Sequence, residues 1–218
     1  RTRNFRVAND NAFSQPLQMV ALPPLDPTHI PGTKLYNKYT VYENGLIPAK
    51  YNSFNAEVYR NIGNVYALFN LLPELSFRTE FGMDLTNQRE KGYQGRLTND
   101  GGPFGNASDR TVTLLNTTSN SYFSYDKTFK ENYNLNLVGG MSYQEAVWNT
   151  SAGYAQNFPS DHFKRLDSAA EITGVSSNGT NYSFLSYFLR SNLKFFDKYL
   201  VTLSGRIDGS SRFGKNSR

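Results

Sequence analysis

The chain of 218 residues has no cysteine, only two histidines and a single tryptophan. The absence of cysteine excludes disulfides and thiolate metal sites. His29 and His162 do not form the His-x-x-x-His spacing of a metal-binding helix, and the sequence has neither a phosphate-binding loop nor a dinucleotide fingerprint. We therefore expect no cofactor, no metal site and no enzymatic activity.

One run contains the three residue types of a hydrolase catalytic triad. Ser160, Asp161 and His162 are consecutive, but sequence neighbours rarely converge on one proton path. The run is more typical of a helix start with Ser160 as the N-cap, which predicts a short helix near residues 159–170.

Long apolar runs and basic runs are absent as well. No run of about 18 apolar residues occurs, so the sequence predicts no membrane-spanning helix. The formal net charge is +5, but the lysines and arginines are scattered singly, and we expect no nucleic-acid partner.

The chain is rich in aromatic residues. It contains 16 Phe and 15 Tyr at a mean hydropathy of -0.57. Many aromatic side chains in a polar chain favour β-structure, so we expect an all-β fold.

The first 53 residues differ from the rest. Six prolines punctuate them, and they predict a long loop region with at most a short strand end or a helical turn near residues 14–21. Residues 54–218 instead contain six strand-like segments, at 59–71, 75–86, 111–129, 133–148, 182–195 and 199–208. Three-residue joints separate the strands within each pair, whereas residues 87–110 and 149–181 are long connections. Short turns on one side and long loops on the other are typical of an outer-membrane barrel, with periplasmic turns and extracellular loops.

The second strand has a clean alternation of side chains. Leu75, Phe77 and Met83 share one face, and charged residues share the other, because strand side chains alternate with a period of two. The same alternation gives a set of candidate lumen-facing residues: Arg78, Glu80, Asp84, Arg190, Lys194, Arg206 and Asp208. Structural ion pairs within the sheet are the alternative role for these charges.

Strand length favours a membrane protein over a soluble one. A spanning strand needs about 9 to 11 residues, whereas strands of soluble sheets mostly have about 5 to 6. Aromatic residues beside the short turns are typical of barrel rims, although they also pack soluble sheets. A soluble all-β glycan-binding module remains the alternative.

Three aromatic residues lie in or beside the long loop after the fourth strand: Trp148, Tyr154 and Phe158. Aromatic rings stack well on sugars and on peptide side chains. We expect these rings to contact a solute or a lid protein, and packing within the loop is the alternative role.

The last strand and the loop after it carry the most specific motif. The run Arg-x-Asp-Gly-Ser-Ser-Arg-Phe at residues 206–213, the preceding segment 184–198, and Tyr125-x-Lys127-x-Phe129 resemble the SusC/RagA family of TonB-linked outer-membrane transporters. The looser resemblance covers most of residues 55–218.

The resemblance implies a stretch of a plugged barrel of the 22-stranded type in the outer membrane of a Gram-negative, Bacteroidetes-type bacterium. It implies import of oligosaccharides or peptides, driven by TonB-ExbB-ExbD and assisted by a SusD-like surface lipoprotein, with outer-membrane lipid around the wall. The chain begins on Arg1 and contains neither a recognisable plug domain nor a TonB box. We therefore expect a piece of a longer protein.

Overall fold

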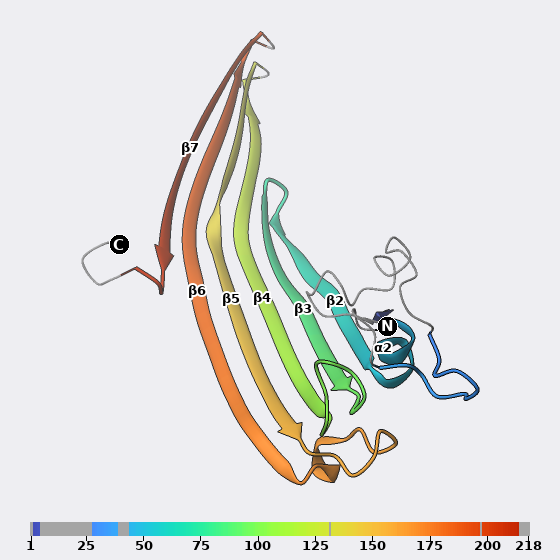
Figure 1. Cartoon of the computed structure of the whole chain (residues 1–218). Helices are drawn as coiled ribbons and strands as arrows, with labels where there is room; N and C mark the ends of the chain where they lie inside the picture. Colours follow the sequence, from blue (N-terminus) through green and yellow to red (C-terminus); the bar gives the residue numbers. More distant parts are fainter. Residues whose placement is uncertain (1, 5–27, 39–43, 131, 197, 214–218) are drawn as a thin grey trace. The chain divides into compact units, whose positions relative to one another are not determined.

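Figure 1 shows the computed structural model, which describes residues 2–4, 28–38, 44–130, 132–196 and 198–213. Within these residues, seven strands form one sheet in which chain neighbours are sheet neighbours. The strands are β1 (Thr2–Asn4), β2 (Ser53–Leu72), β3 (Leu75–Gln94), β4 (Asn106–Phe129), β5 (Tyr133–Gln156), β6 (Glu171–Phe195) and β7 (Tyr199–Ser210). The expected all-β fold with six long strands is confirmed.

The chain divides into two compact units, and each is described by itself. Unit 1 contains residues 1–59, 87–112 and 149–178. Unit 2 contains residues 60–86, 113–148 and 179–218.

The first 53 residues hold two short elements among the described ones. β1 pairs antiparallel with β2, with Thr2 opposite Val58, and the helix α2 covers Leu46–Tyr51. The helical turn predicted near residues 14–21 lies outside the described residues.

Three tight turns join the long strands into hairpins. They lie between β2 and β3, between β4 and β5, and between β6 and β7. Lys130 and Phe196 adopt φ angles of 48° and 51°, in the left-handed region that lets a chain reverse tightly. The Phe196 amide donates to the carbonyl of Asn132 at 2.8 Å, which connects two of the turns.

At the ends away from these turns, the strands are longer than the sequence predicts. β3 ends at Gln94 and not at residue 86, and β5 ends at Gln156 and not at 148. β6 begins at Glu171 and not at residue 182. The extra residues are polar or glycine-rich and lack apolar alternation, but backbone pairing needs only amide and carbonyl groups.

Unit 2 gathers aromatic and aliphatic side chains on one face of its sheet. The rings of Phe77 on β3 and Phe123 on β4 lie 4.8 Å apart. In the β6–β7 register, Leu193 lies opposite Val201. We call this surface, formed by the odd-numbered residues of β3–β7 in unit 2, the apolar face.

The even-numbered residues form the opposite, polar face. Ser142 on β5 donates to the Asn120 side-chain oxygen on β4 at 2.6 Å. Thr202 on β7 donates to Asn192 on β6 at 2.9 Å. The parity predicted from the sequence therefore holds across neighbouring strands.

The apolar face is exposed. Leu203 and Ile207 on β7 are 63% and 75% exposed, and Tyr199 and Val201 are also exposed. Among the described residues of unit 2, Ala146 is the only buried hydrophobic one. A soluble sheet buries one face against a second layer, and the described part of unit 2 contains no such layer.

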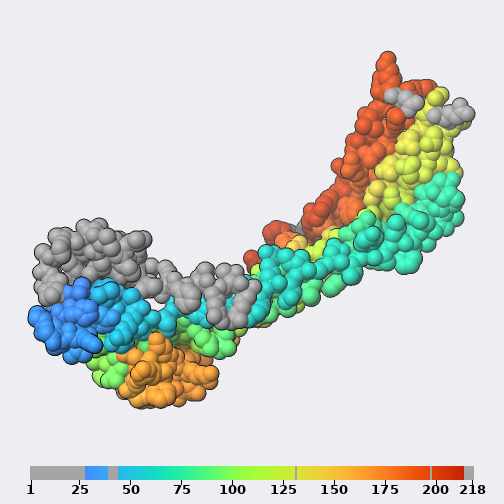
Figure 2. Space-filling view, turned by 90° about the vertical axis from the view of Figure 1, so that its right-hand side faces the viewer, coloured from blue at the N-terminus to red at the C-terminus, as the bar shows by residue number. Residues whose placement is uncertain are grey.

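Unit 1 has a small core of its own. Tyr93, Ala107, Ala155 and Phe158 form the buried cluster, and Leu166 packs against it. The Tyr93 and Phe158 rings meet edge to face at 5.2 Å. In Figure 2 the blue, green and orange segments of this unit form one packed group.

The helix predicted near residues 159–170 is wrong. The described structure has bends there and a single 3-10 turn, Leu166–Ser168. Arg165 has extended backbone angles, and the Asp161 side chain accepts hydrogen bonds from β3 and the loop after it, so the segment follows those partners. Among the described residues no helix is long and apolar enough to cross a membrane.

Lipid contact of the apolar face can be tested on β4 with two neighbouring substitutions in the full-length protein. Phe123→Arg should cost about 2 to 4 kcal/mol of unfolding free energy in a bilayer, because a charge would enter hydrocarbon. Ser124→Arg, on the polar face, should cost less than about 1 kcal/mol. Urea unfolding from lipid vesicles measures both, and equal costs would contradict the assignment of the faces.

Candidate functional site

The seven candidate lumen-facing residues all lie on the polar face of unit 2. They come from β3, β6 and β7, and each has an even number. That this face lines a lumen stays a prediction, and the structure groups the seven residues into two separate clusters.

The first cluster lies on β2 and β3. Asp84 accepts two hydrogen bonds from the Arg60 guanidinium, at 2.9 and 2.6 Å. Arg78 pairs with Glu80 at 2.6 Å and lies 4.4 Å from the centre of the Tyr66 ring. Sequence reasoning missed Arg60 and Tyr66, because the alternation of the first strand is weak.

The second cluster lies on β6 and β7. Arg206 donates to Asp208 at 2.7 Å and to the hydroxyl of Ser186 at 3.0 Å. Arg190 lies opposite Ser204 in the strand register, and Lys194 lies opposite Leu200.

Two strands, β4 and β5, separate the clusters, which places β3 and β6 about 14 Å apart at the usual strand spacing. The charged side chains of each cluster are at least partly accessible. Ion pairs of this kind contribute only about 0 to 1 kcal/mol. The arginines therefore remain available to exchange a carboxylate of the sheet for one from elsewhere.

An aromatic pair lies on the same polar face. The rings of Tyr122 on β4 and Phe188 on β6 lie 6.4 Å apart. Gly140 lies on β5, between their strands, and a side chain at Gly140 would collide with Tyr122. Sequence reasoning missed this pair, although both residues have even numbers, which places both rings on the polar face.

In unit 1, two connecting segments are joined by a set of hydrogen bonds. The Tyr93 hydroxyl and the Arg96 amide both donate to one Asp161 carboxylate oxygen, at 2.8 and 2.9 Å. The Arg96 guanidinium donates to the Pro159 carbonyl at 2.8 Å. We call the group of α2 and residues 95–105 and 157–170 the loop platform. Burial and the Asp161 carboxylate raise the pKa of Tyr93 above its ordinary value.

The Ser160-Asp161-His162 run does not have triad geometry. The His162 amide donates to the Ser160 hydroxyl at 3.2 Å, and the carboxylate of Asp161 accepts from Tyr93 and Arg96. The described residues also contain no group of acidic, histidine or cysteine side chains that could hold a metal ion.

The loop platform contains a pocket of about 480 Å³. Its charged lining comprises Lys50, Arg96, Asp161 and Lys164. Three cations and one carboxylate suit an anionic group of a solute or of a partner protein.

The three predicted aromatic contacts have different surroundings. Trp148 and Tyr154 lie within β5 and not in a loop, and Tyr154 is 45% exposed. Phe158 is 2% exposed because its ring packs on Tyr93. The buried ring of Phe158 serves the core of unit 1 and has no free face for a solute.

Comparison with protein-family models gives no match. Curated relatives are found by sequence. TonB-dependent receptor P3 of Formosa agariphila is 32% identical over 166 residues, which covers 75% of this chain and 16% of that receptor. TonB-dependent receptor SusC of Bacteroides thetaiotaomicron is 26% identical over 159 residues, which covers 72% of this chain and 16% of SusC.

Solved structures have the same fold. The RagAB peptide transporter superposes with a TM-score of 0.76 at 23% identity, over 84% of this chain and 21% of the matched one. The chain belongs to the SusC/RagA group of TonB-dependent receptors.

The homology covers most of this chain and only a small part of each of these receptors. The chain spans about a sixth of the length of the curated relatives that it matches. These relatives are receptors and a transporter by name, and not enzymes. For a SusC/RagA-type receptor, the polar face and the loop platform are the two surfaces to consider.

The Tyr93 hydrogen bond to Asp161 can be tested by hydrogen exchange. Tyr93→Phe should lower the free energy of local opening of residues 158–166 by about 1.5 to 3 kcal/mol, because the Asp161 carboxylate loses a buried donor. Tyr154→Phe, on an exposed ring, is the matched control and should leave the protection unchanged.

The same bond predicts a dependence on pH. A tyrosine whose pKa is raised in the folded state stabilises it below the unfolded pKa of about 10, and this contribution is lost as pH rises further. Protection of residues 158–166 should fall more steeply above about pH 10 in the wild type than in Tyr93→Phe. Equal slopes would show that the hydroxyl does not hold the loop.

Proposed function

We propose that this chain forms part of the wall of an outer-membrane transporter that imports oligosaccharides or peptides. Import would be coupled to TonB-ExbB-ExbD through the plug region of the full-length protein. A SusD-like lipoprotein would cover the extracellular end. The host would be a Gram-negative bacterium of the Bacteroidetes type.

The observation that carries this proposal is the exposed apolar face of unit 2. Exposed rings and aliphatic side chains continue along β3–β7, and the described part of the unit has almost no buried hydrophobic residue. Monomeric soluble proteins rarely expose apolar patches above a few hundred Å². Lipid is the solvent that suits such a face, whereas the soluble glycan-binding alternative would need a second layer.

The polar face would then line the lumen. Its arginine–carboxylate pairs are partly accessible, and the Tyr122 and Phe188 rings lie among polar side chains. Such a wall can contact a plug through exchangeable ion pairs, and it can offer rings to a passing sugar or peptide.

The loop platform would lie on the extracellular side. It is built from the long connections, which are extracellular in barrels of this type. Its cationic pocket and the exposed Tyr154 are the surfaces that we assign to solute capture or lid docking.

Sidedness is testable by cysteine labelling, because this chain has no cysteine. Leu97→Cys, in the connection between β3 and β4, and Phe196→Cys, in a tight turn, both replace exposed residues. In intact cells expressing a cysteine-free full-length protein, a membrane-impermeant maleimide should label position 97 and not 196. Osmotic opening of the outer membrane should make both positions reactive.

Labelling of position 196 in intact cells, with position 97 protected, would contradict the proposed orientation of the chain in the membrane. The proposal of an outer-membrane transporter is wrong if the full-length protein stays in aqueous buffer without detergent and migrates identically on gels whether boiled or not.

A further inference from the structure

The connection after β5 lines two cationic pockets of unit 1. The first pocket is that of the loop platform. The second pocket has a volume of about 360 Å³ and lies between residues 164–167 and the strands β3 and β4. Lys164 lines both pockets, so the two are adjacent and within reach of one extended ligand.

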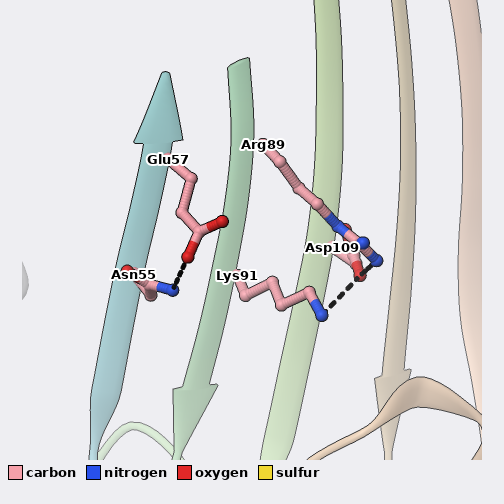
Figure 3. A network of polar contacts seen from close by, with 5 residues as sticks. All are labelled: Asn55, Glu57, Arg89, Lys91 and Asp109. Carbon is pink, nitrogen blue, oxygen red and sulfur yellow. Dashed lines mark hydrogen bonds and ion pairs between the residues drawn. The ribbon is translucent and has the colours of Figure 1, made fainter. Parts of the chain in front are cut away.

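A row of charged side chains forms the strand side of the second pocket. Figure 3 shows Arg89 and Lys91 on β3 beside Asp109 on β4. Arg89 donates twice to Asp109, at 3.2 and 2.7 Å. The Lys91 amine lies 3.9 Å from the same carboxylate, and the Lys91 side chain is 48% exposed. Asp109 is therefore engaged mainly by Arg89, and Lys91 keeps donors for a further anion.

Each pocket has an excess of two positive charges. The second pocket is lined by four cations and two carboxylates, and the first by three cations and one carboxylate. In the second pocket, the Arg165 side chain has no ion pair or hydrogen bond among the described residues. In the first, the Lys50 amine lies 5.0 and 5.4 Å from the ring centres of Tyr36 and Tyr51, and it has no ion pair within the described structure.

The segment between the two pockets is held at both ends. The Ala170 amide donates to the Asn157 carbonyl at 2.9 Å, and the Phe158 amide donates to the Phe104 carbonyl at 2.8 Å. Asp161 is fixed by the two hydrogen bonds described above. Compact loops whose ends lie close together are frequently functional. A preformed site of this kind loses little free energy to ordering when a ligand binds.

We propose that the two pockets together bind one acidic oligosaccharide. The inference rests on the proposed function, because it names the class of solute that the loop platform captures. One carboxylate or sulfate group of the sugar binds at Lys50 and Arg96, and a second binds at Lys91 and Arg165. Lys164 lies between the two groups. Ammonium and guanidinium groups hold such anions through charge-assisted hydrogen bonds.

The surroundings of the pockets favour a sugar over an acidic peptide. Peptides commonly bind by adding a strand to a free sheet edge, and β3 and β4 are interior strands of the sheet. Tyr51 lines the first pocket, and aromatic rings stack on sugar faces. The Tyr36 ring meets the Tyr51 ring edge to face at 6.5 Å, which supports it. A supported ring among cations suits an anionic sugar.

The test measures binding to the full-length protein in detergent by isothermal titration calorimetry. The probes are tetrasaccharides of galacturonic acid, mannuronic acid and sulfated galactose, each beside its methyl-esterified or desulfated form. The peptide tetraglutamate represents the other class of acidic ligand. Wild type should bind at least one acidic sugar about a hundredfold more tightly than its neutral form, because two anionic groups are recognised.

Two variants each remove one cation, one from each pocket. Lys50→Gln and Arg165→Gln should each weaken binding of the same acidic sugar about tenfold, because each removes a charge-assisted hydrogen bond. The control Lys34→Gln removes an exposed charge of the same unit and should bind as wild type. Lys50→Arg and Arg165→Lys keep the charge and should keep most of the affinity, which separates loss of charge from loss of fold.

Four outcomes would overturn the proposal. Failure of wild type to prefer the acidic form in any pair, absence of binding included, means that acidic sugars are not recognised. Tighter binding of tetraglutamate than of every sugar means that the ligand is a peptide. An effect of only one of the two variants means that the pockets do not share a ligand. Unchanged sugar binding by both variants, with loss of a co-purifying lipoprotein, means that the pockets dock the lid.

The proposed function and this inference fail in different ways. A wild-type protein that is soluble without detergent refutes both. A detergent-dependent protein without a preference for acidic sugars refutes this inference alone.

Discussion

The structure depends on one constraint: long strands in unit 2 pair their backbone groups with each other while one face of the sheet stays apolar and uncovered. Backbone pairing within the sheet removes the need for water at these groups, which is the condition for a strand to cross hydrocarbon. The exposed Leu203 and Ile207 are costly in water and suited to lipid. The polar face, with paired arginines and carboxylates, is then the side that can remain wet.

The same strands change character outside unit 2. In β3, the odd-numbered positions run from Phe81 and Met83 to Arg89 and Lys91, so one strand face carries first apolar and then charged side chains. In unit 1, connecting segments pack on the strands through Tyr93 and Phe158, and a small core of the ordinary kind forms there. The two units thus have different sources of stability along one set of strands.

Much of the fold could be predicted because alternation is a local signal. The parity of β3, β6 and β7 can be read from the sequence, and it puts all seven charged candidates on one face. The loop platform could not be predicted, since Asp161 is fixed by Tyr93 and Arg96, more than sixty residues earlier in the chain. The sequence left two roles open for Phe158 for the same reason, because an aromatic ring in a polar connection gives no sign that a second ring will bury it. The Tyr122 and Phe188 pair required the register of three neighbouring strands.

The most direct test of the account is a spin-label scan of residues 199–208 in the full-length protein in a bilayer. Collision with oxygen, which concentrates in hydrocarbon, should vary with a period of two. If lipid covers the apolar face, the maxima lie at Tyr199, Val201, Leu203 and Ile207 and the minima at Thr202, Ser204 and Arg206. A flat profile, or maxima at the even-numbered positions, would contradict the claim that lipid covers the apolar face.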